Sequence, residues 1–180
     1  MTNASHNFWE FSLQVYRAPK VADTCLGLQN GYGLDVNLLL FCCWYGKFYG
    51  ILPTGLLENA YEHSISWRGN VVQPLRNARS WMKTAPAATP LTSPEFEALR
   101  QQIKSIELTA EKMQQQALEK LAAESATESR MGDRIPETGT GTGVDENLKR
   151  LLERYGLQAS PALESMLEII TRATAEQPAS

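Results

Sequence analysis

Residues 35–45 read DVNLLLFCCWY, and this short run decides the fold of the chain. Asp35 stands where an N-cap would accept hydrogen bonds from the free backbone N–H groups of a first helical turn. Gly46 closes the run, and apolar residues between the two would point in every direction around a helix. A helix of this kind belongs at the centre of a bundle or in a membrane. We therefore predict a central helix over residues 35–46.

The apolar run also bears on two alternatives, a membrane span and a buried strand. Its uninterrupted part, residues 38–45, is eight residues long, whereas a helix needs about 20 to cross a bilayer. A buried strand would show the same run, because periodicity alone does not separate the two. We choose a helix because three consecutive leucines are good helix formers and no partner strand is predicted elsewhere.

The chain up to residue 84 is predicted to form further amphipathic helices around this centre. Asn7 and Glu10 stand three residues apart, the spacing of a capping box, at the start of the first helix. Pro74 lies inside the last, and we expect a kink or break near Gln73, because proline removes one backbone hydrogen bond and clashes with the preceding turn. The predicted helices cover residues 8–18, 19–30, 55–66 and 67–83.

A long helix is predicted over residues 94–124, with Pro94 at its first position. Its apolar residues recur alternately every three and four positions, which suits packing on a bundle or on a second copy of the chain. Gln114 and Gln115 are assigned to its other, polar face. The apolar seam consists of Phe96, Leu99, Ile103, Ile106, Ala110, Met113, Ala117 and Leu121.

The C-terminal part is predicted as an appendage to one bundle domain, residues 7–124. Residues 125–143 have low complexity and are predicted to be a flexible linker. Residues 144–176 are predicted to form a helical hairpin, which is smaller than the roughly 40 residues that usually fold alone. It must dock on the bundle, on another subunit or on a partner. The predicted fold is all-α, an orthogonal or irregular bundle with a long helix and this hairpin.

Composition and charge limit the classes of function. A formal net charge of −3 argues against a general nucleic-acid binder, which usually carries a basic surplus. Three cysteines, two of them adjacent, make no disulfide framework and favour a reducing compartment. Residues 1–7 lack the basic segment and apolar core of a signal peptide. We expect a cytoplasmic protein without a membrane span.

Three strings of sequence carry a resemblance to a known family: CLGLQ at 25–29, DVNLLLFCCW at 35–44 and VVQPLR at 71–76. The chain resembles a proteobacterial family catalogued as domain of unknown function 2390. The resemblance covers roughly residues 8–120 and leaves out the tail from about residue 125. It implies a small cytoplasmic bacterial protein and supplies no activity.

No catalytic motif is present, neither a phosphate-binding loop nor a nucleophile elbow nor a zinc-protease helix. Cys42 and Cys43 would point about 100° apart on a helix and cannot easily share one metal ion. Cys25 and His63 would have to approach one of them, whereas a buried free cysteine acting as a small hydrophobe is commoner. We predict no catalytic residue, no metal and no cofactor.

Four basic residues form the first candidate site, and the predicted helix 67–83 places three of them on one face. One interpretation is a solvated surface, and the other is a stripe that binds an acidic protein segment or a phosphorylated ligand, since arginine suits bidentate contacts. RNA is a third partner for the same stripe, which the negative net charge disfavours. The residues are Arg68, Arg76, Arg79 and Lys83.

A second candidate site is an aromatic pocket beside the central helix. Trp44, Tyr45 and Tyr49 either rim this pocket or close the core. Asn37 is the one polar residue inside the central run. Its amide either bonds to the backbone, because an unpaired buried group costs about 1–3 kcal/mol, or lines the pocket.

Two functional hypotheses follow. The first is a non-enzymatic protein-interaction or adaptor module of unknown partner, in which the long helix and the tail supply the surface and the long helix provides for a homo-oligomer. The alternative is a small-molecule-binding protein or enzyme that uses the aromatic pocket.

Overall fold

The computed structural model describes residues 6–84, 94–130 and 142–178, and every regular element among them is a helix, so the all-α prediction is confirmed. Asn7 caps the first helix by accepting a hydrogen bond from the backbone N–H of Glu10, as the capping-box spacing predicts. The elements are α1 (Phe8–Arg17), α2 (Val21–Tyr32), α3 (Val36–Phe48), α4 (Thr54–Trp67), the π-helical turn η1 (Arg68–Val72), α5 (Gln73–Thr84), α6 (Pro94–Arg130), α7 (Thr142–Arg154) and α8 (Pro161–Ala175).

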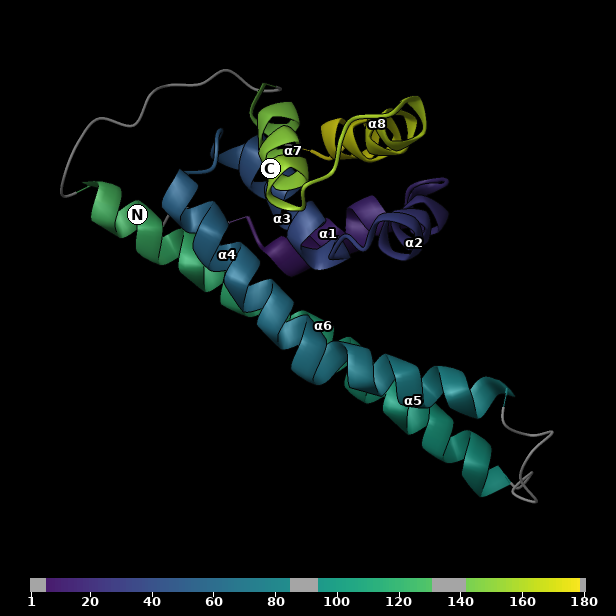
Figure 1. The fold of residues 1–180 in the computed structure, drawn as a ribbon. Helices are drawn as coiled ribbons and strands as arrows, with labels where there is room; N and C mark the ends of the chain where they lie inside the picture. Colours follow the sequence, from purple (N-terminus) through teal and green to yellow (C-terminus); the bar gives the residue numbers. More distant parts are fainter. Residues whose placement is uncertain (1–5, 85–93, 131–141, 179–180) are drawn as a thin grey trace.

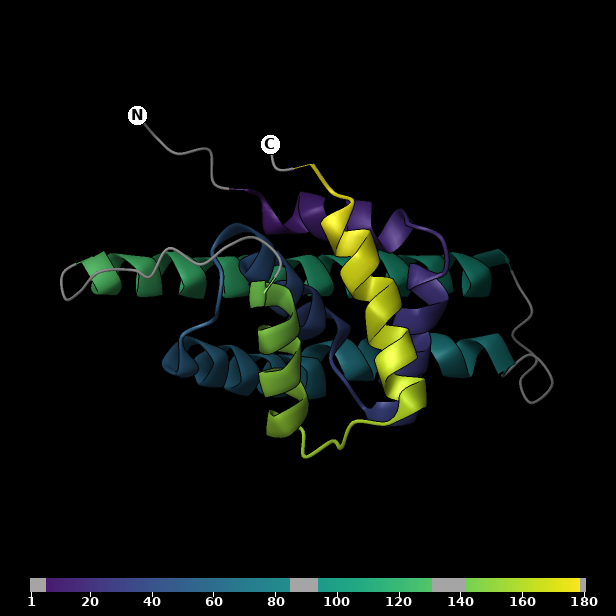
Figure 2. The same cartoon turned by 90° about the horizontal axis from the view of Figure 1, so that it is seen from above.

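Two long antiparallel rods lie side by side, and the shorter helices gather on one side of them (Figure 1). One rod is the continuous segment α4–η1–α5, and the other is α6. From above, α7 and α8 run across the direction of these rods (Figure 2). None of the helices in the described ranges is long and apolar enough to cross a membrane.

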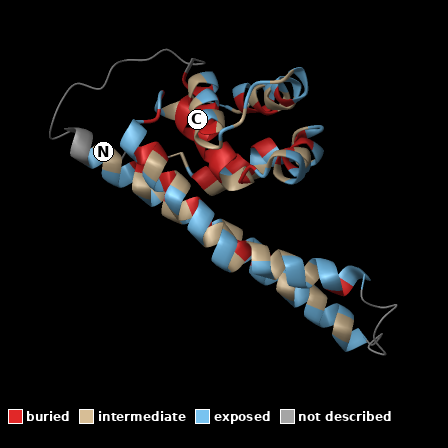
Figure 3. Cartoon of the chain, viewed as in Figure 1, coloured by how far each residue is buried: buried red, intermediate tan, exposed pale blue. Residues whose placement is uncertain are grey.

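Helix α3 occupies the centre, as its all-apolar surface predicts. Every residue from Leu38 to Gly46 is buried, and α3 contacts α1, α2, α4, α6, α7 and α8. Asp35 caps the helix, because its Oδ1 accepts hydrogen bonds from the backbone N–H groups of Asn37 (2.8 Å) and Leu38 (3.2 Å). The buried residues concentrate in α3 and the faces turned toward it (Figure 3).

The C-terminal segment docks on the bundle of its own chain. Helix α7 crosses α3 at very short range, since a Cβ built on Gly46 would lie 2.6 Å from the backbone of Val144. The buried side chain of Asn147 accepts from the backbone N–H of Leu52 (2.8 Å) and donates to the carbonyl of Gly50 (3.1 Å). Helix α8 packs on α2 and α3, so both helices share the core of the bundle.

Pro74 widens its helix instead of breaking it. The sequence predicts separate helices over 55–66 and 67–83, whereas α4, η1 and α5 form one uninterrupted rod. The π-helical turn lies directly before the proline, and the backbone N–H of Gln73 bonds to the carbonyl of Arg68, five residues back. A wider turn relieves the clash and the lost hydrogen bond that proline imposes on a regular helix.

Helix α6 presents a different face to the core from the predicted one. Gln114 and Gln115, which we assigned to the polar outer face, are buried, while Ile106 and Met113 of the predicted seam are about half exposed. The helix runs to Arg130, six residues beyond the predicted end at Glu124. Residues 131–141 of the predicted linker lie outside the described part of the chain.

Candidate functional site

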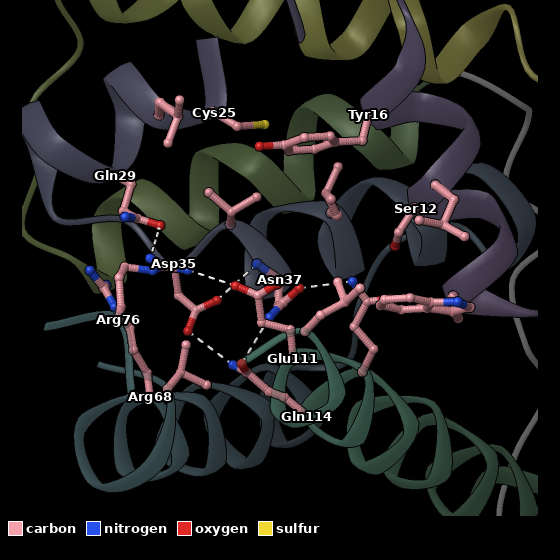
Figure 4. Close-up of a pocket in the computed structure, with 18 residues that line it drawn as sticks. Ser12, Tyr16, Cys25, Gln29, Asp35, Asn37, Arg68, Arg76, Glu111 and Gln114 are labelled. Carbon is pink, nitrogen blue, oxygen red and sulfur yellow. Dashed lines mark hydrogen bonds and ion pairs between the residues drawn. The ribbon is translucent and has the colours of Figure 1, made fainter. Parts of the chain in front are cut away.

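A cavity of about 210 Å³ opens beside the start of α3, enclosed by α1, α2, η1, α5 and α6. Figure 4 shows its polar side chains turned toward one another between α3 and α6. Its apolar walls include Trp9, Leu13, Leu26, Val36, Leu40 and Leu108.

Asp35 links the cap of α3 to this cavity. Its Oδ1 serves the backbone of α3, while its Oδ2 accepts a hydrogen bond from Gln114 Nε2 on α6 (2.9 Å). The side chain is almost completely buried, and this burial raises the pKa of the Asp35 carboxyl despite the hydrogen bonds that favour its charged form. The backbone N–H of Asp35 donates to the hydroxyl of Tyr155 (3.2 Å), which follows α7, so the C-terminal segment also contacts the start of α3.

Three side-chain amides extend from Asp35 as a hydrogen-bonded chain. Gln114 receives a hydrogen bond from Asn37 Nδ2 at its Oε1 (2.9 Å). Asn37 in turn receives one from Gln115 Nε2 at its Oδ1 (2.8 Å). Asn37 and Gln114 each accept from one neighbour and donate to the next, Gln115 only donates within this chain, and the chain ends on the Asp35 carboxylate. Asn37 lines this cavity, which does not include the aromatic residues of the predicted pocket.

Arginine and glutamate side chains close the far side of the cavity. Arg76 forms ion pairs with Glu107 (3.0 Å) and Glu111 (2.6 Å), and Arg79 forms another with Glu107. Burial tends to raise the pKa of Glu107, but hydrogen bonds from the two arginines outweigh it and lower that pKa. Burial dominates at Glu111, whose pKa is raised. These pairs fix α5 against α6.

The four basic residues of the predicted stripe do not share an open surface. Arg68 and Arg76 line the cavity, and Arg68 also donates to the carbonyl of Gly33 (2.6 Å). Arg79 faces Glu107, while Lys83 is exposed farther along α5. The sequence placed them together on a surface because it did not show that glutamates of α6 lie opposite. Anion binding by these residues stays a prediction.

The aromatic residues of the predicted pocket lie at the opposite end of α3. Trp44 and Tyr49 pack with ring centroids 5.1 Å apart, and neither they nor Tyr45 line the cavity. The indole N–H of Trp44 donates to the carbonyl of His6 (2.9 Å). At 1.5 Å per residue, Asn37 and Tyr45 are about 12 Å apart along the axis. Trp44 and Tyr45 are buried in the core and Tyr49 is exposed, while the cavity belongs to the start of the helix.

Sequence reasoning missed most of the polar lining. Gln29, Tyr16 and Cys25 come from α1 and α2, and Glu111, Gln114 and Gln115 from α6. A signal existed in α6, where residues 107, 110, 114, 118 and 122 are spaced as one helical face and are all buried. Its polar members made that face resemble a solvated one.

The three cysteines are buried, and burial raises the pKa of each thiol. Burial raises the pKa of the Cys25 thiol to about 12, so the thiol stays protonated at neutral pH and is no activated nucleophile. Cys42 and Cys43 are buried free thiols in α3. Within the described ranges, no group of three or more His, Cys, Asp or Glu side chains is placed to hold a metal ion.

Comparison with known proteins gives a family match and nothing further. A family model described as "Protein of unknown function (DUF2390)" matches residues 7–118, which confirms the resemblance. All residues that line the cavity fall inside this range, whereas Tyr155 and α7 lie beyond it. Neither the curated proteins nor the solved structures gave a match.

Proposed function

The chain belongs to the family described as Protein of unknown function (DUF2390), and we propose that it binds a small organic molecule in the cavity at the start of α3. Ligand sites are typically concave and mostly apolar, with a few placed polar groups that orient the ligand. The cavity has this composition, with apolar side chains from α1, α2 and α3 around the Asp35 carboxylate and its amides.

The observation that carries the proposal is the burial of polar side chains around the cavity. Asp35 alone suffices to cap α3, yet Gln114 and Gln115 are buried with it, at 1% and 3% exposure. Burying amides costs free energy that apolar side chains at the same positions would not incur. Polar groups held in this arrangement serve recognition better than they serve stability.

A thermal-shift screen of small organic fragments tests the proposal. A fragment that binds only the folded state at 100 times its Kd stabilises the protein by about 2.7 kcal/mol. Leu108→Trp places an indole at a cavity-lining position, and Leu99→Trp is the matched control because both leucines are about half exposed on α6 and Leu99 lies outside the cavity.

We expect fragments that raise the Tm of the native protein and of Leu99→Trp, with little or no response from Leu108→Trp. A broad library without a single shift, or equal responses from both variants, would contradict binding in this cavity.

A second candidate function is association with another copy through α6. Leu99, Ile106 and Met113 are 50%, 54% and 51% exposed and stand seven residues apart, so they form one apolar stripe. This candidate rests on α6, whereas α7 and α8 pack on the bundle of their own chain. Light scattering during size exclusion should give a dimer mass that Ile106→Glu reduces and that Ser105→Glu, an exposed control on another face of α6, preserves. A monomer mass for the native chain would remove this candidate.

Both functions are proposed for the cytoplasm of a bacterial cell. The unpaired state of all three cysteines supports a reducing compartment.

A further inference from the structure

Arg68 is the basic side chain of the cavity that has no carboxylate partner among the described residues. The cavity lining contains two basic residues, Arg68 and Arg76. Arg76 directs Nε at Glu107 (3.0 Å) and Nη2 at Glu111 (2.6 Å). Arg68 makes one hydrogen bond, from Nη1 to the carbonyl of Gly33, and in the described part of the chain it forms no ion pair. One guanidinium group of the cavity is therefore not used in clamping α5 to α6.

The other nitrogens of Arg68 are available to a ligand. A guanidinium group has five N–H donors, and the bond to Gly33 uses one of them. Arg68 Nε and Nη2 have no hydrogen-bond partner among the described residues and are not buried, so a bound molecule can reach them. Figure 4 shows Arg68 on the same side of the cavity as Asp35 and Arg76.

Asp35 lies near this guanidinium without occupying it. Burial raises the pKa of the Asp35 carboxyl, whereas its hydrogen bonds and the nearby charge of Arg68 lower it, so the guanidinium lies within electrostatic reach of the cavity lining. Both carboxylate oxygens are already used, Oδ1 by the backbone of α3 and Oδ2 by Gln114. An anion that contacts Arg68 would therefore not have to displace a carboxylate of the chain.

The free Nε and Nη2 form the edge through which an arginine holds a planar carboxylate by two parallel hydrogen bonds. An engineered apolar cavity of about 150 Å³ holds benzene, so 210 Å³ accommodates one ring with a small planar substituent. The apolar walls suit a hydrocarbon body. Asp35 and Glu111 also line the cavity and repel negative charge, which favours a singly charged carboxylate over a phosphate group.

We propose that the cavity takes a small monocarboxylate with a hydrocarbon body of about single-ring size, held by its carboxylate on Nε and Nη2 of Arg68. This inference rests on the proposed function, since it names the chemical class of the molecule that the cavity binds.

Benzoate, benzamide and benzamidine test the charge preference at nearly constant shape. Each is a phenyl ring with a planar head group, and at neutral pH the three are anionic, uncharged and cationic. Water holds an ion more strongly than a neutral amide, so a cavity without a charged partner prefers benzamide. A cavity that binds its ligand through Asp35 or Glu111 prefers benzamidine. A preference for benzoate reports a cationic group that contacts the ligand.

The experiment measures the Kd of each probe by NMR titration of the native chain and of two variants. Arg68→Gln removes the guanidinium group. Lys112→Gln is the control, because it removes one positive charge near the cavity, 5.6 Å from the ring of Trp9, at a residue that does not line it. We expect the native chain and Lys112→Gln to prefer benzoate. In Arg68→Gln the ratio of the Kd values should move toward benzamide by about tenfold or more, as for a hydrogen bond to a charged group.

Several results would overturn the inference. Benzamide or benzamidine binding to the native chain at least as tightly as benzoate would contradict the carboxylate preference while leaving the binding function intact. A benzoate preference that Arg68→Gln retains would assign the anion to another group. Binding of none of the three would also overturn the inference, and the fragment screen then decides whether the proposed function stands.

A measurement on the native chain keeps the inference testable even if Arg68→Gln does not fold. Benzoate should shift the Nε–H signal of Arg68 in ¹H–¹⁵N spectra more than benzamide does, because the carboxylate bonds to that group. An unchanged signal, or equal shifts from both probes, would contradict the contact.

Discussion

Replacing Gly46 by alanine tests the close crossing of α3 and α7. A Cβ at this position would lie 2.6 Å from both N and Cα of Val144, and 2.8 Å from the carbonyl carbon of Gly143. These are backbone atoms, so no side-chain rotation relieves the overlap. Helix α7 would have to move outward and loosen the contacts of Val144 and Leu148, which are both buried in the core.

The expected magnitude combines two opposing effects. Inserting one carbon into a well-packed core costs about 1–3 kcal/mol. Alanine is the better helix former by about 1 kcal/mol, which opposes the loss. Because the overlap is with backbone atoms, the cost lies at the upper end of this range, and we expect Gly46→Ala to lower the free energy of unfolding by about 2 kcal/mol. Gly31→Ala is the matched control, because Gly31 also lies in a helix and a Cβ there meets no atom within 4 Å.

Urea unfolding at 25 °C measures both variants, with the free energy obtained from the midpoint and the slope. We expect a lower midpoint for Gly46→Ala and an unchanged or slightly higher one for Gly31→Ala. If Gly46→Ala matched or exceeded the native stability, α7 would not approach α3 at this position, and the docking of the C-terminal segment would be wrong.

Three further predictions concern polar groups. Asn147→Leu removes three buried hydrogen bonds between α7 and the α3 end, so we expect a loss of about 2 kcal/mol or more in urea unfolding; an unchanged midpoint would contradict those bonds. Asp35, with its raised pKa, stabilises the fold fully below its ordinary value of 3.8 and loses that contribution as pH rises through the folded-state pKa. Glu107, with its lowered pKa, contributes above its ordinary 4.5 and loses this as pH falls. The free energy of unfolding is measured for the native chain, Asp35→Asn and Glu107→Gln between pH 3 and 7. As the pH rises, the stability of the native chain relative to Asp35→Asn should fall, and its stability relative to Glu107→Gln should rise. Equal slopes would refute the assigned directions. Arg79→Gln should lower stability by about 0.5–1 kcal/mol while Lys83→Gln changes it little, because Arg79, unlike Lys83, forms an ion pair with buried Glu107; equal effects would argue against that pair.

The centre of the fold was predictable because one run of residues has no polar face. An all-apolar helix with Asp35 as its cap leaves few alternatives to burial in a bundle, and the structure places α3 there. The position of the irregular helical turn before Pro74 was also predictable, but its π-helical geometry was not. A missing N–H requires some adjustment of the helix, but sequence does not decide between a break and a π-helical turn.

The orientation of α6 was not predictable from hydrophobic periodicity. Its apolar seam and its buried face overlap only in part, because Glu107, Gln114 and Gln115 are buried by pairing with Arg76, Arg79 and residues of α3. Such pairing depends on side chains that are distant in sequence. The candidate site therefore lies on a face of α6 that its polar residues led us to predict as solvent-exposed.

The packing of α7 against α3 was not predictable for a related reason. Gly143 ends a run of alternating Thr and Gly that is typical of a flexible linker, yet it lies in α7 against Gly46. Its lack of a side chain allows the close crossing of two helices. Asn147 then satisfies backbone groups near the end of α3, a role that no spacing rule shows.

The side-chain amide signals of Asn37, Gln114 and Gln115 test small-molecule binding at the start of α3 most directly. In ¹H–¹⁵N spectra recorded with and without benzoate, we expect all three to shift together, because they form one hydrogen-bonded chain, while exposed Gln116 does not shift. If the three amides stayed unchanged, or if only the indole signal of Trp44 moved, the ligand would not occupy this cavity.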